Sequence, residues 1–243
     1  MNYYMLTGIK IGVAVLLAVL FGNGCVVAFN RIPVRWFEET TEDGERRLPE
    51  GLMDQGDGQR QRIPSTPWKY IFVAYFAACG IFFALRESLI FEITVLFVLA
   101  VILEMAISDL KYQIVPDPLS LMLAISAVGF ISFQKEWWEP LAGAALAAAI
   151  VTAVFGLGRL IYHRDIIGGA DLKFFMAIGL ISGRSGMLII FVVTQILIGI
   201  HALYRLLTRR AGPGTSMPML PYAFAASTVY FLFLWDAVGI LQL

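Results

Sequence analysis

Long apolar stretches alternate with short polar segments along almost the whole of this chain. Most of the stretches come close to the ~20 residues that cross a bilayer as a helix. Lipid offers no partner to free backbone N–H and C=O groups, so each stretch must be helical. The pattern therefore predicts about eight transmembrane helices. They are expected at residues 5–29, 70–85, 88–107, 118–133, 140–162, 171–181, 187–206 and 218–241.

Composition supports an all-α, polytopic membrane protein that lies in a lipid bilayer. Hydrophobic residues make up 59% of the chain and charged residues only 15%, which is too apolar for an ordinary soluble domain. The formal net charge is zero, so nothing suggests a nucleic-acid partner. The first apolar stretch is too long for a cleaved signal peptide, and we expect it to be retained as a span.

The longest polar segment, residues 30–68, follows the first span. It mixes arginines with acidic residues, contains no cysteine, and has a glycine-rich part at residues 50–61 that predicts a flexible loop. We therefore divide the chain into residues 1–68, a first helix plus this cytoplasmic loop, and residues 69–243, a helical membrane core. The acidic run at residues 38–45 could attract a basic peptide, or it could be a solvated, disordered surface.

Basic residues are distributed unequally between the two sets of connecting segments. Cytoplasmic loops of membrane proteins carry the excess of Lys and Arg, so the richer set is expected to be cytoplasmic and both termini to face outward. The poorer set holds Arg86, Lys135 and Arg184. The richer set holds Arg31, Arg35, Arg46, Arg47, Arg60, Arg62, Lys69, Lys111, Arg159, Arg164, Arg205, Arg209 and Arg210.

Two aspartates lie at the cytoplasmic ends of different predicted spans. Asp109 ends the third span within SDLKYQIVPD, and Asp171 opens the sixth within GGADLK. Two spans separate them, so the chain returns to the same face and the side chains can meet. Two carboxylates held close share a proton. One can then activate water while the other polarises a peptide carbonyl, which is the chemistry of an aspartic protease.

Simpler roles remain open for these residues and their neighbours. Each aspartate could cap a helix or pair with a lysine. Asp117, just before a proline, could also cap a helix, and Lys111 and Lys173 could be solvated anchors at the membrane surface. These three residues are candidates for supporting the chemistry or binding substrate.

Other polar residues within the spans are weaker candidates. Glu104 should face other helices or water and could bind substrate, whereas Glu92 lies nearer the outer side. His163 and His201 lack partners at ligand spacing and are expected to pack between helices or at the interface. Cys25 is expected to be a small buried hydrophobe, as is Cys79.

Four motifs in order resemble those of the bacterial type IV prepilin peptidases, the leader peptidases of pilins and type II secretion pseudopilins. DLKYQIVPDPLSL (Asp109–Leu121) resembles the family's first aspartate motif, and GGADLKFFMAIG (Gly168–Gly179) resembles its Gly-x-Gly-Asp motif. GNGCVVAFNRIP (Gly22–Pro33) and PMLPY (Pro218–Tyr222) resemble motifs near the family's two ends. Together they cover most of the chain.

The resemblance implies that Asp109 and Asp171 are the catalytic aspartates, with Gly168 and Gly169 letting the backbone bend and approach closely before Asp171. The substrate would be a prepilin or pseudopilin with a short basic leader, cut at the cytoplasmic face of the bacterial inner membrane. The peptidase reaction would need no cofactor. S-adenosylmethionine would be required only if the protein also methylates the new N-terminus.

The sequence departs from the family in three places. Ala170 replaces the second glycine before the catalytic aspartate, Val26 replaces an asparagine of the first motif, and the loop at residues 30–68 lacks the family's zinc-binding cysteines. We expect activity to survive the alanine. Because the cysteines and the asparagine are missing, we expect no metal site in the loop and favour peptidase activity without methylation.

Two other functions stay open at this stage. A presenilin-like intramembrane protease also uses two aspartates, but it would cut within a span. A cation transporter could use Asp109, Asp171 and Glu104 as a pathway, although the sequence shows no inverted repeat of the kind many transporters carry.

Overall fold

The structure is a computed structural model that describes residues 3–40, 46–47, 62–162, 169–208 and 217–236. Helices make up most of this part of the chain. Two strands of two residues each, β1 (Glu39–Thr40) and β2 (Arg46–Arg47), pair antiparallel in the first loop. The sequence pattern did not predict them. The helices are α1 (Tyr3–Arg31), η1 (Val34–Phe37), α3 (Ser65–Arg86), α4 (Leu89–Tyr112), α5 (Asp117–Ser126), η2 (Ala127–Phe133), α6 (Glu139–Tyr162), α7 (Gly169–Leu207), α8 (Leu220–Val229) and η3 (Tyr230–Leu234).

Within the described residues, five helices are long and apolar enough to cross a membrane, namely α1, α3, α4, α6 and α7. Two shorter apolar helical segments are also present, Asp117–Phe133 and Leu220–Leu234. The predicted class, a helical multi-pass membrane protein, is thus confirmed. The number of crossings and their orientation stay predictions.

The helix α7 is interrupted at Gly183, where φ is 68° and ψ is −171°. Glycine adopts this backbone conformation at little cost because it has no Cβ. The rings of Phe175 and Phe191 lie 5.1 Å apart, although sixteen residues of unbroken helix would separate them by about 24 Å. The chain therefore folds back at Gly183, between the predicted spans 171–181 and 187–206.

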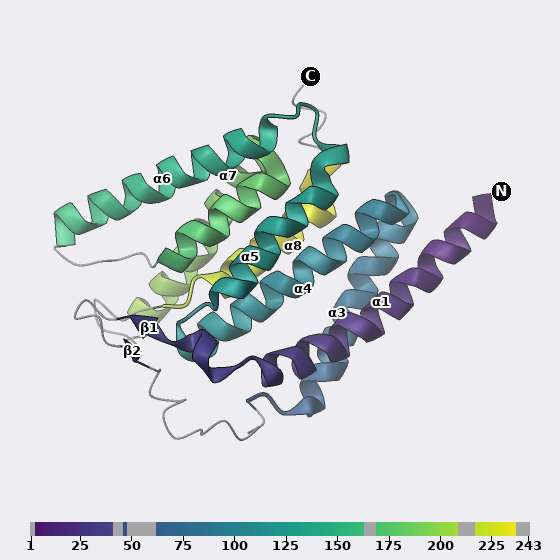
Figure 1. The fold of residues 1–243 in the computed structure, drawn as a ribbon, viewed down its shortest axis with the longest axis horizontal. Coiled ribbons are helices and arrows are strands. Elements are labelled where there is room, and N and C mark those ends of the chain that lie inside the picture. The colour runs from purple at the N-terminus through teal and green to yellow at the C-terminus, as the bar shows by residue number, and fades with distance from the viewer. Residues whose placement is uncertain (1–2, 41–45, 48–61, 163–168, 209–216, 237–243) are drawn as a thin grey trace.

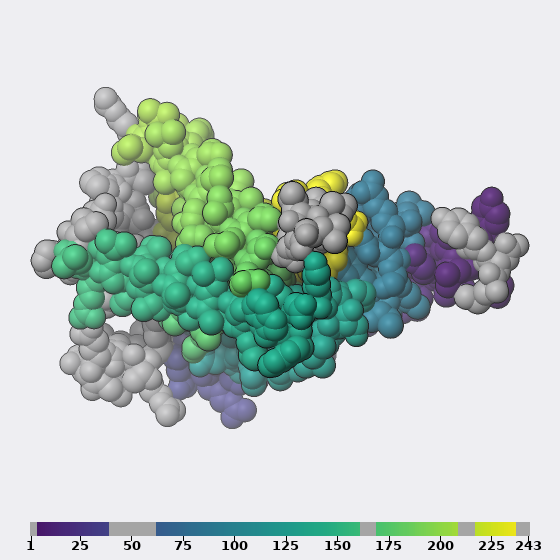
Figure 2. Space-filling model, turned by 90° about the horizontal axis from the view of Figure 1, so that it is seen from above, coloured from purple at the N-terminus to yellow at the C-terminus, as the bar shows by residue number. Residues whose placement is uncertain are grey.

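Figure 1 shows the helices side by side in one bundle. The helices α6 and α7 form one edge and α1 and α3 the other, with α4, α5 and α8 between them. Figure 2 shows the same molecule from above, narrowing from the α6–α7 edge towards the start of α1. The central helix α4 supplies many of the fully buried side chains, so its polar residues are held in the middle of the protein.

Close backbone contact joins α6 to α7. A Cβ built at Gly143 would collide with backbone atoms of Gly179 and Gly183, and one at Gly179 would collide with Gly143 and Ala144. Small residues let membrane helices approach in this way. The packing role that the Ala- and Gly-rich stretch at residues 140–162 suggested is confirmed at these positions.

The two ends of the first polar loop are tied together. The Asn30 amide donates to the Ile63 carbonyl at 3.0 Å and accepts the Ile63 N–H at 2.8 Å. The Arg62 guanidinium donates to the Phe29 carbonyl at 3.3 Å and lies over the Phe37 ring at 5.0 Å. Partial burial lowers the pKa of Arg62, against a smaller opposing effect of Tyr112. The acidic run at residues 38–45 lies largely outside the described residues, and the hypothesis about it stays a prediction.

Candidate active site

Asp109 lies in the last turns of α4, and its side chain is buried, with 9% of its surface exposed. Ser88 caps the start of the helix, and its hydroxyl accepts the Phe91 N–H at 3.3 Å. Gln113 caps the other end and adopts a left-handed conformation with φ of 54°. The predicted third span stopped at residue 107. The helix instead continues past Asp109, so this carboxylate is held on a rigid element.

The start of α8 lies against the Asp109 carboxylate. The Leu220 N–H donates a hydrogen bond to Asp109 Oδ2 at 2.8 Å. The backbone N–H of Met219 also interacts with this carboxylate. The first N–H groups of a helix have no partner within it, and they carry a partial positive charge. Asp109 thus supplies an acceptor that the start of α8 needs, and α8 in turn fixes the orientation of Asp109.

A fixed turn connects Asp109 to α5. The Ser108 hydroxyl, fully buried, donates to the Ile114 carbonyl at 2.5 Å. The Gln113 N–H donates to the Asp109 carbonyl at 2.9 Å. Pro116 then precedes α5, and residues before a proline are biased away from helix. The turn brings Asp117, the first residue of α5, close to the end of α4.

Asp171 lies in the first turn of α7 and is half-buried. Two residues later, Lys173 Nζ forms an ion pair with Asp117 Oδ1 at 2.6 Å. This contact joins the two aspartate motifs at one end of the bundle. Asp117 therefore pairs with a lysine instead of capping a helix, and Lys173 is exposed but is not merely a solvated anchor.

The other residues that the sequence suggested as supporting the site do not take part in the Asp117–Lys173 contact. Gly168 lies outside the described residues. A Cβ at Gly169 would meet no atom within 4 Å, so the close approach predicted at this glycine is absent. Lys111 donates to the Arg62 carbonyl. Glu104 is half-buried on α4 and lies near Cys25.

Residues of α7 that were not predicted as site residues contact the start of α8. The His201 ring on α7 and the Tyr222 hydroxyl on α8 are hydrogen-bonded, and Gln195 Nε2 donates to Met219 Sδ at 3.9 Å. From the sequence, His201 was expected to pack between helices or to lie at the membrane interface. The PMLPY motif marked this stretch, but no local pattern could indicate its contact with His201.

Glu92, a polar residue within a span, lies away from the site. Glu92 is fully buried near the start of α4, and neither of its carboxylate oxygens has a hydrogen-bond partner in the described part of the chain. About 26 Å of helix separates Glu92 from Asp109, as expected from the sequence.

Cys25 and Cys79 are free and buried, which confirms their predicted packing role. Among the described residues, no group of three His, Cys, Asp or Glu could hold a metal ion.

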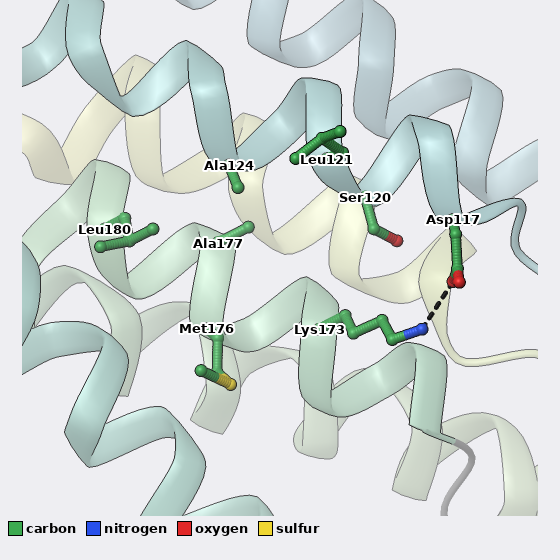
Figure 3. A pocket seen from close by; sticks show the side chains of 8 residues that line it. All are labelled: Asp117, Ser120, Leu121, Ala124, Lys173, Met176, Ala177 and Leu180. Carbon is green, nitrogen blue, oxygen red and sulfur yellow. Dashed lines mark hydrogen bonds and ion pairs between the residues drawn. The ribbon is translucent and has the colours of Figure 1, made fainter.

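A groove of about 360 Å³ lies between α5 and α7 and begins at the ion pair. Figure 3 shows Asp117 and Ser120 on α5 facing Lys173 and Ala177 on α7. The groove is lined by Asp117, Ser120, Leu121, Ala124, Lys173, Met176, Ala177 and Leu180. One end of the groove is thus charged and the rest is mainly apolar.

Comparison with known proteins agrees with the motifs. The sequence model described as "Type IV leader peptidase family" matches residues 94–203. The resemblance to the type IV leader peptidases is confirmed. Asp109, Asp117, Asp171 and Lys173 all lie inside the stretch that matches this family, whereas α1, α3 and α8 lie outside it.

One curated relative is the "Prepilin leader peptidase/N-methyltransferase" of Bacillus subtilis (strain 168). It is 24% identical to this chain over 163 residues, which cover 65% of the chain and 61% of the relative. The chain thus aligns with less than two thirds of that type IV leader peptidase. No solved structure matches the chain significantly.

Proposed function

We propose that this protein is a membrane aspartic endopeptidase that removes the leader peptide of type IV prepilins or type II secretion pseudopilins. The proposal rests on one observation. Asp109 and Asp171 both lie in the stretch that matches the leader peptidase family, and the Asp117–Lys173 ion pair joins their two motifs at one end of the bundle. The reaction would take place at the cytoplasmic face of a bacterial inner membrane.

In this proposal Asp109 and Asp171 form the catalytic pair. One carboxylate takes a proton from water, and the water oxygen attacks the scissile carbonyl carbon. The other, protonated, donates a hydrogen bond to the carbonyl oxygen and then its proton, which gives a tetrahedral intermediate. The C–N bond then breaks as the first carboxyl group passes the proton that it took from water to the leaving nitrogen, and the second carboxylate regains its proton from the hydroxyl as the carbonyl re-forms. The N–H of Leu220 and the turn after Ser108 hold Asp109 in place, and such positioning is itself a large part of catalysis. The peptidase step needs no cofactor.

We further propose that the protein cleaves without methylating the new N-terminus. Val26 and the cysteine-free loop depart from the family pattern in the same chain. The relative from Bacillus subtilis carries both activities in its name, so the question is specific to this chain. Mass spectrometry of the mature substrate distinguishes the two cases, since methylation adds a fixed mass to the N-terminal fragment. A methylated N-terminus would contradict this part of the proposal.

The test of the peptidase is co-expression with a prepilin, with leader removal followed by gel shift. Asp109→Asn and Asp171→Asn should each lower the rate at least about a hundredfold, the usual minimum contribution of an acid–base residue. Asp236→Asn, an exposed aspartate near the end of the described chain, is the matched control and should process normally. Normal processing by either active-site variant would overturn the proposal.

The position of the cut separates this function from the presenilin-like alternative. A leader peptidase cuts before the apolar helix of its substrate, whereas an intramembrane protease cuts inside it. N-terminal sequencing of the product reports which bond is broken. Cation uptake by reconstituted vesicles without any cleavage would instead favour a transporter.

A further inference from the structure

Ser120 differs from most other hydroxyl side chains of the apolar helices and shares its lack of a partner, within the described residues, with Ser227. Ser182, Thr194 and Thr228 each donate to the backbone carbonyl four residues earlier, at 2.7–2.8 Å, the usual solution in an apolar helix. Ser120 is only 7% exposed, and its hydroxyl has no partner in the described part of the chain. Leaving a buried hydroxyl unpaired is unfavourable, so a hydrogen-bond partner supplied by a ligand would stabilise Ser120 in a way that the described residues do not.

The hydroxyl points into the groove between α5 and α7, above the aliphatic part of Lys173 (Figure 3). The ion pair of Asp117 and Lys173 closes one end, and Leu121, Met176 and Leu180 line the rest. Seven residues of helix give the groove a length of about 10 Å, which fits about three residues of extended peptide. Its charged end begins within one helical turn of Asp171.

We propose that this α5–α7 groove binds the extended segment of the substrate next to the scissile bond, and that Ser120 donates a hydrogen bond to a substrate carbonyl. The inference rests on the proposed peptidase function. A peptide must be extended to be cut, and its backbone groups then have no partners of their own in an apolar environment. Ser120 supplies one partner, and the apolar lining accepts the side chains that lead into the substrate helix.

The groove also matches the polarity of such a substrate. A leader peptide passes from water into the membrane at the point of cleavage, and the groove changes from charged to apolar over a few residues. A lipid acyl chain could fill the apolar part, but it has no use for a buried hydroxyl donor. We therefore assign the groove to peptide, and make lipid an outcome of the test.

The first experiment compares Ser120→Ala with Ser227→Ala. Both hydroxyls are buried and unpaired in the described part of the chain, but Ser227 lies on α8 outside the groove. With purified full-length protein and a synthetic prepilin peptide, Ser120→Ala should raise KM roughly fivefold, which corresponds to one net hydrogen bond. Its kcat should change less than twofold, and Ser227→Ala should leave both constants unchanged. Equal effects of the two variants would overturn the proposal.

A second pair of variants compares a tryptophan that blocks the groove with a control tryptophan outside it, both at partly exposed positions. Met176 is 36% exposed and lines the groove, whereas Leu188, at 38%, lies on the second segment of α7 outside it. Met176→Trp should raise KM at least tenfold, while Leu188→Trp should match the wild type. Thermal unfolding of both variants checks that they fold, and a KM unchanged in a folded Met176→Trp protein contradicts the assignment.

The occupant is identified with a photo-crosslinking residue at Leu121, with Leu157 on α6 as the control of similar exposure. Position 121 should crosslink to the labelled peptide and lose that adduct when unlabelled peptide is added. Crosslinks to lipid alone at position 121 would mean that the groove is a lipid site.

Failure of the proposed function and failure of this inference give different results. If the wild-type protein fails to cleave any prepilin, the proposed function itself fails. If it cleaves but the groove variants behave like their controls, only this inference fails.

Discussion

At the residue scale, burial gives several ionisable groups properties that their sequence neighbours do not suggest. Glu87 lies between α3 and α4, outside the apolar helices. Burial and the nearby Asp236 carboxylate raise the pKa of Glu87, while Lys10 and Arg86 oppose this effect. This group makes stability depend on pH at the end of α4 opposite Asp109.

The direction in which stability changes with pH follows from the proton that Glu87 binds in the folded protein. Above the ordinary value of 4.5, folded protein keeps the Glu87 proton that unfolded chain has lost, so the free energy of unfolding falls as pH rises through this window. Glu87→Gln should remove this contribution and flatten the pH dependence of thermal unfolding. Asp236→Asn should flatten it only partly, because burial of Glu87 remains. A Glu87→Gln protein with the same pH dependence as wild type would contradict the assignment.

At the scale of elements, the first turn of α8 connects α4 to α7. Asp109 on α4 accepts its Leu220 N–H, while Tyr222, two residues later, is bonded to His201 on α7. A second tyrosine contact, from Tyr75 on α3 to Thr228 at 2.7 Å, fixes a later turn of α8. The two hydroxyls therefore fix the same helix at different distances from Asp109.

This difference gives a prediction with an internal control. Tyr222→Phe should lower kcat for leader cleavage roughly tenfold, because small displacements of a catalytic group are costly, and should leave KM nearly unchanged. His201→Gln, which can still bond Tyr222, should retain more activity than His201→Leu. Tyr75→Phe should lower the unfolding temperature without this selective loss of kcat. Equal kcat losses in the two tyrosine variants would mean that Tyr222 acts only through stability.

At the scale of the whole molecule, orientation is the main open prediction. The distribution of basic residues places the α5–α6 connection outside the cell and the end of α7 in the cytoplasm. Trp137 and Leu207 lie in these two places and are 80% and 74% exposed. The native Cys25 and Cys79 are only 2% and 4% exposed, so they should react little with thiol reagents.

A membrane-impermeant maleimide applied to intact cells with permeabilised outer layers should therefore label Trp137→Cys and spare Leu207→Cys. Both variants should be labelled once the membrane is broken. The opposite pattern would invert the orientation and move Asp109 and Asp171 to the outer face. Labelling of both sites from outside would mean that the second segment of α7 does not cross the membrane.

The helices and the candidate aspartates could be predicted from the sequence alone. Apolar length fixes where a membrane helix can lie, and a carboxylate at the end of a span is costly enough to suggest a function. The boundary between the predicted sixth and seventh spans was also visible, since the polar stretch around Gly183 interrupts the apolar pattern. These signals are local and need no knowledge of the neighbouring helices.

Which helix faces meet is known only from the assembled bundle. Asp109 contacts a residue 111 positions away, and Lys173 pairs with Asp117 across 56 positions. In a soluble helix the apolar stripe indicates the buried face. A membrane helix is apolar on nearly all sides, so its sequence does not show which side packs against protein and which faces lipid. The contacts of α8, the α5–α7 groove and the Ser120 hydroxyl, which has no partner among the described residues, therefore become visible only when the helices are assembled.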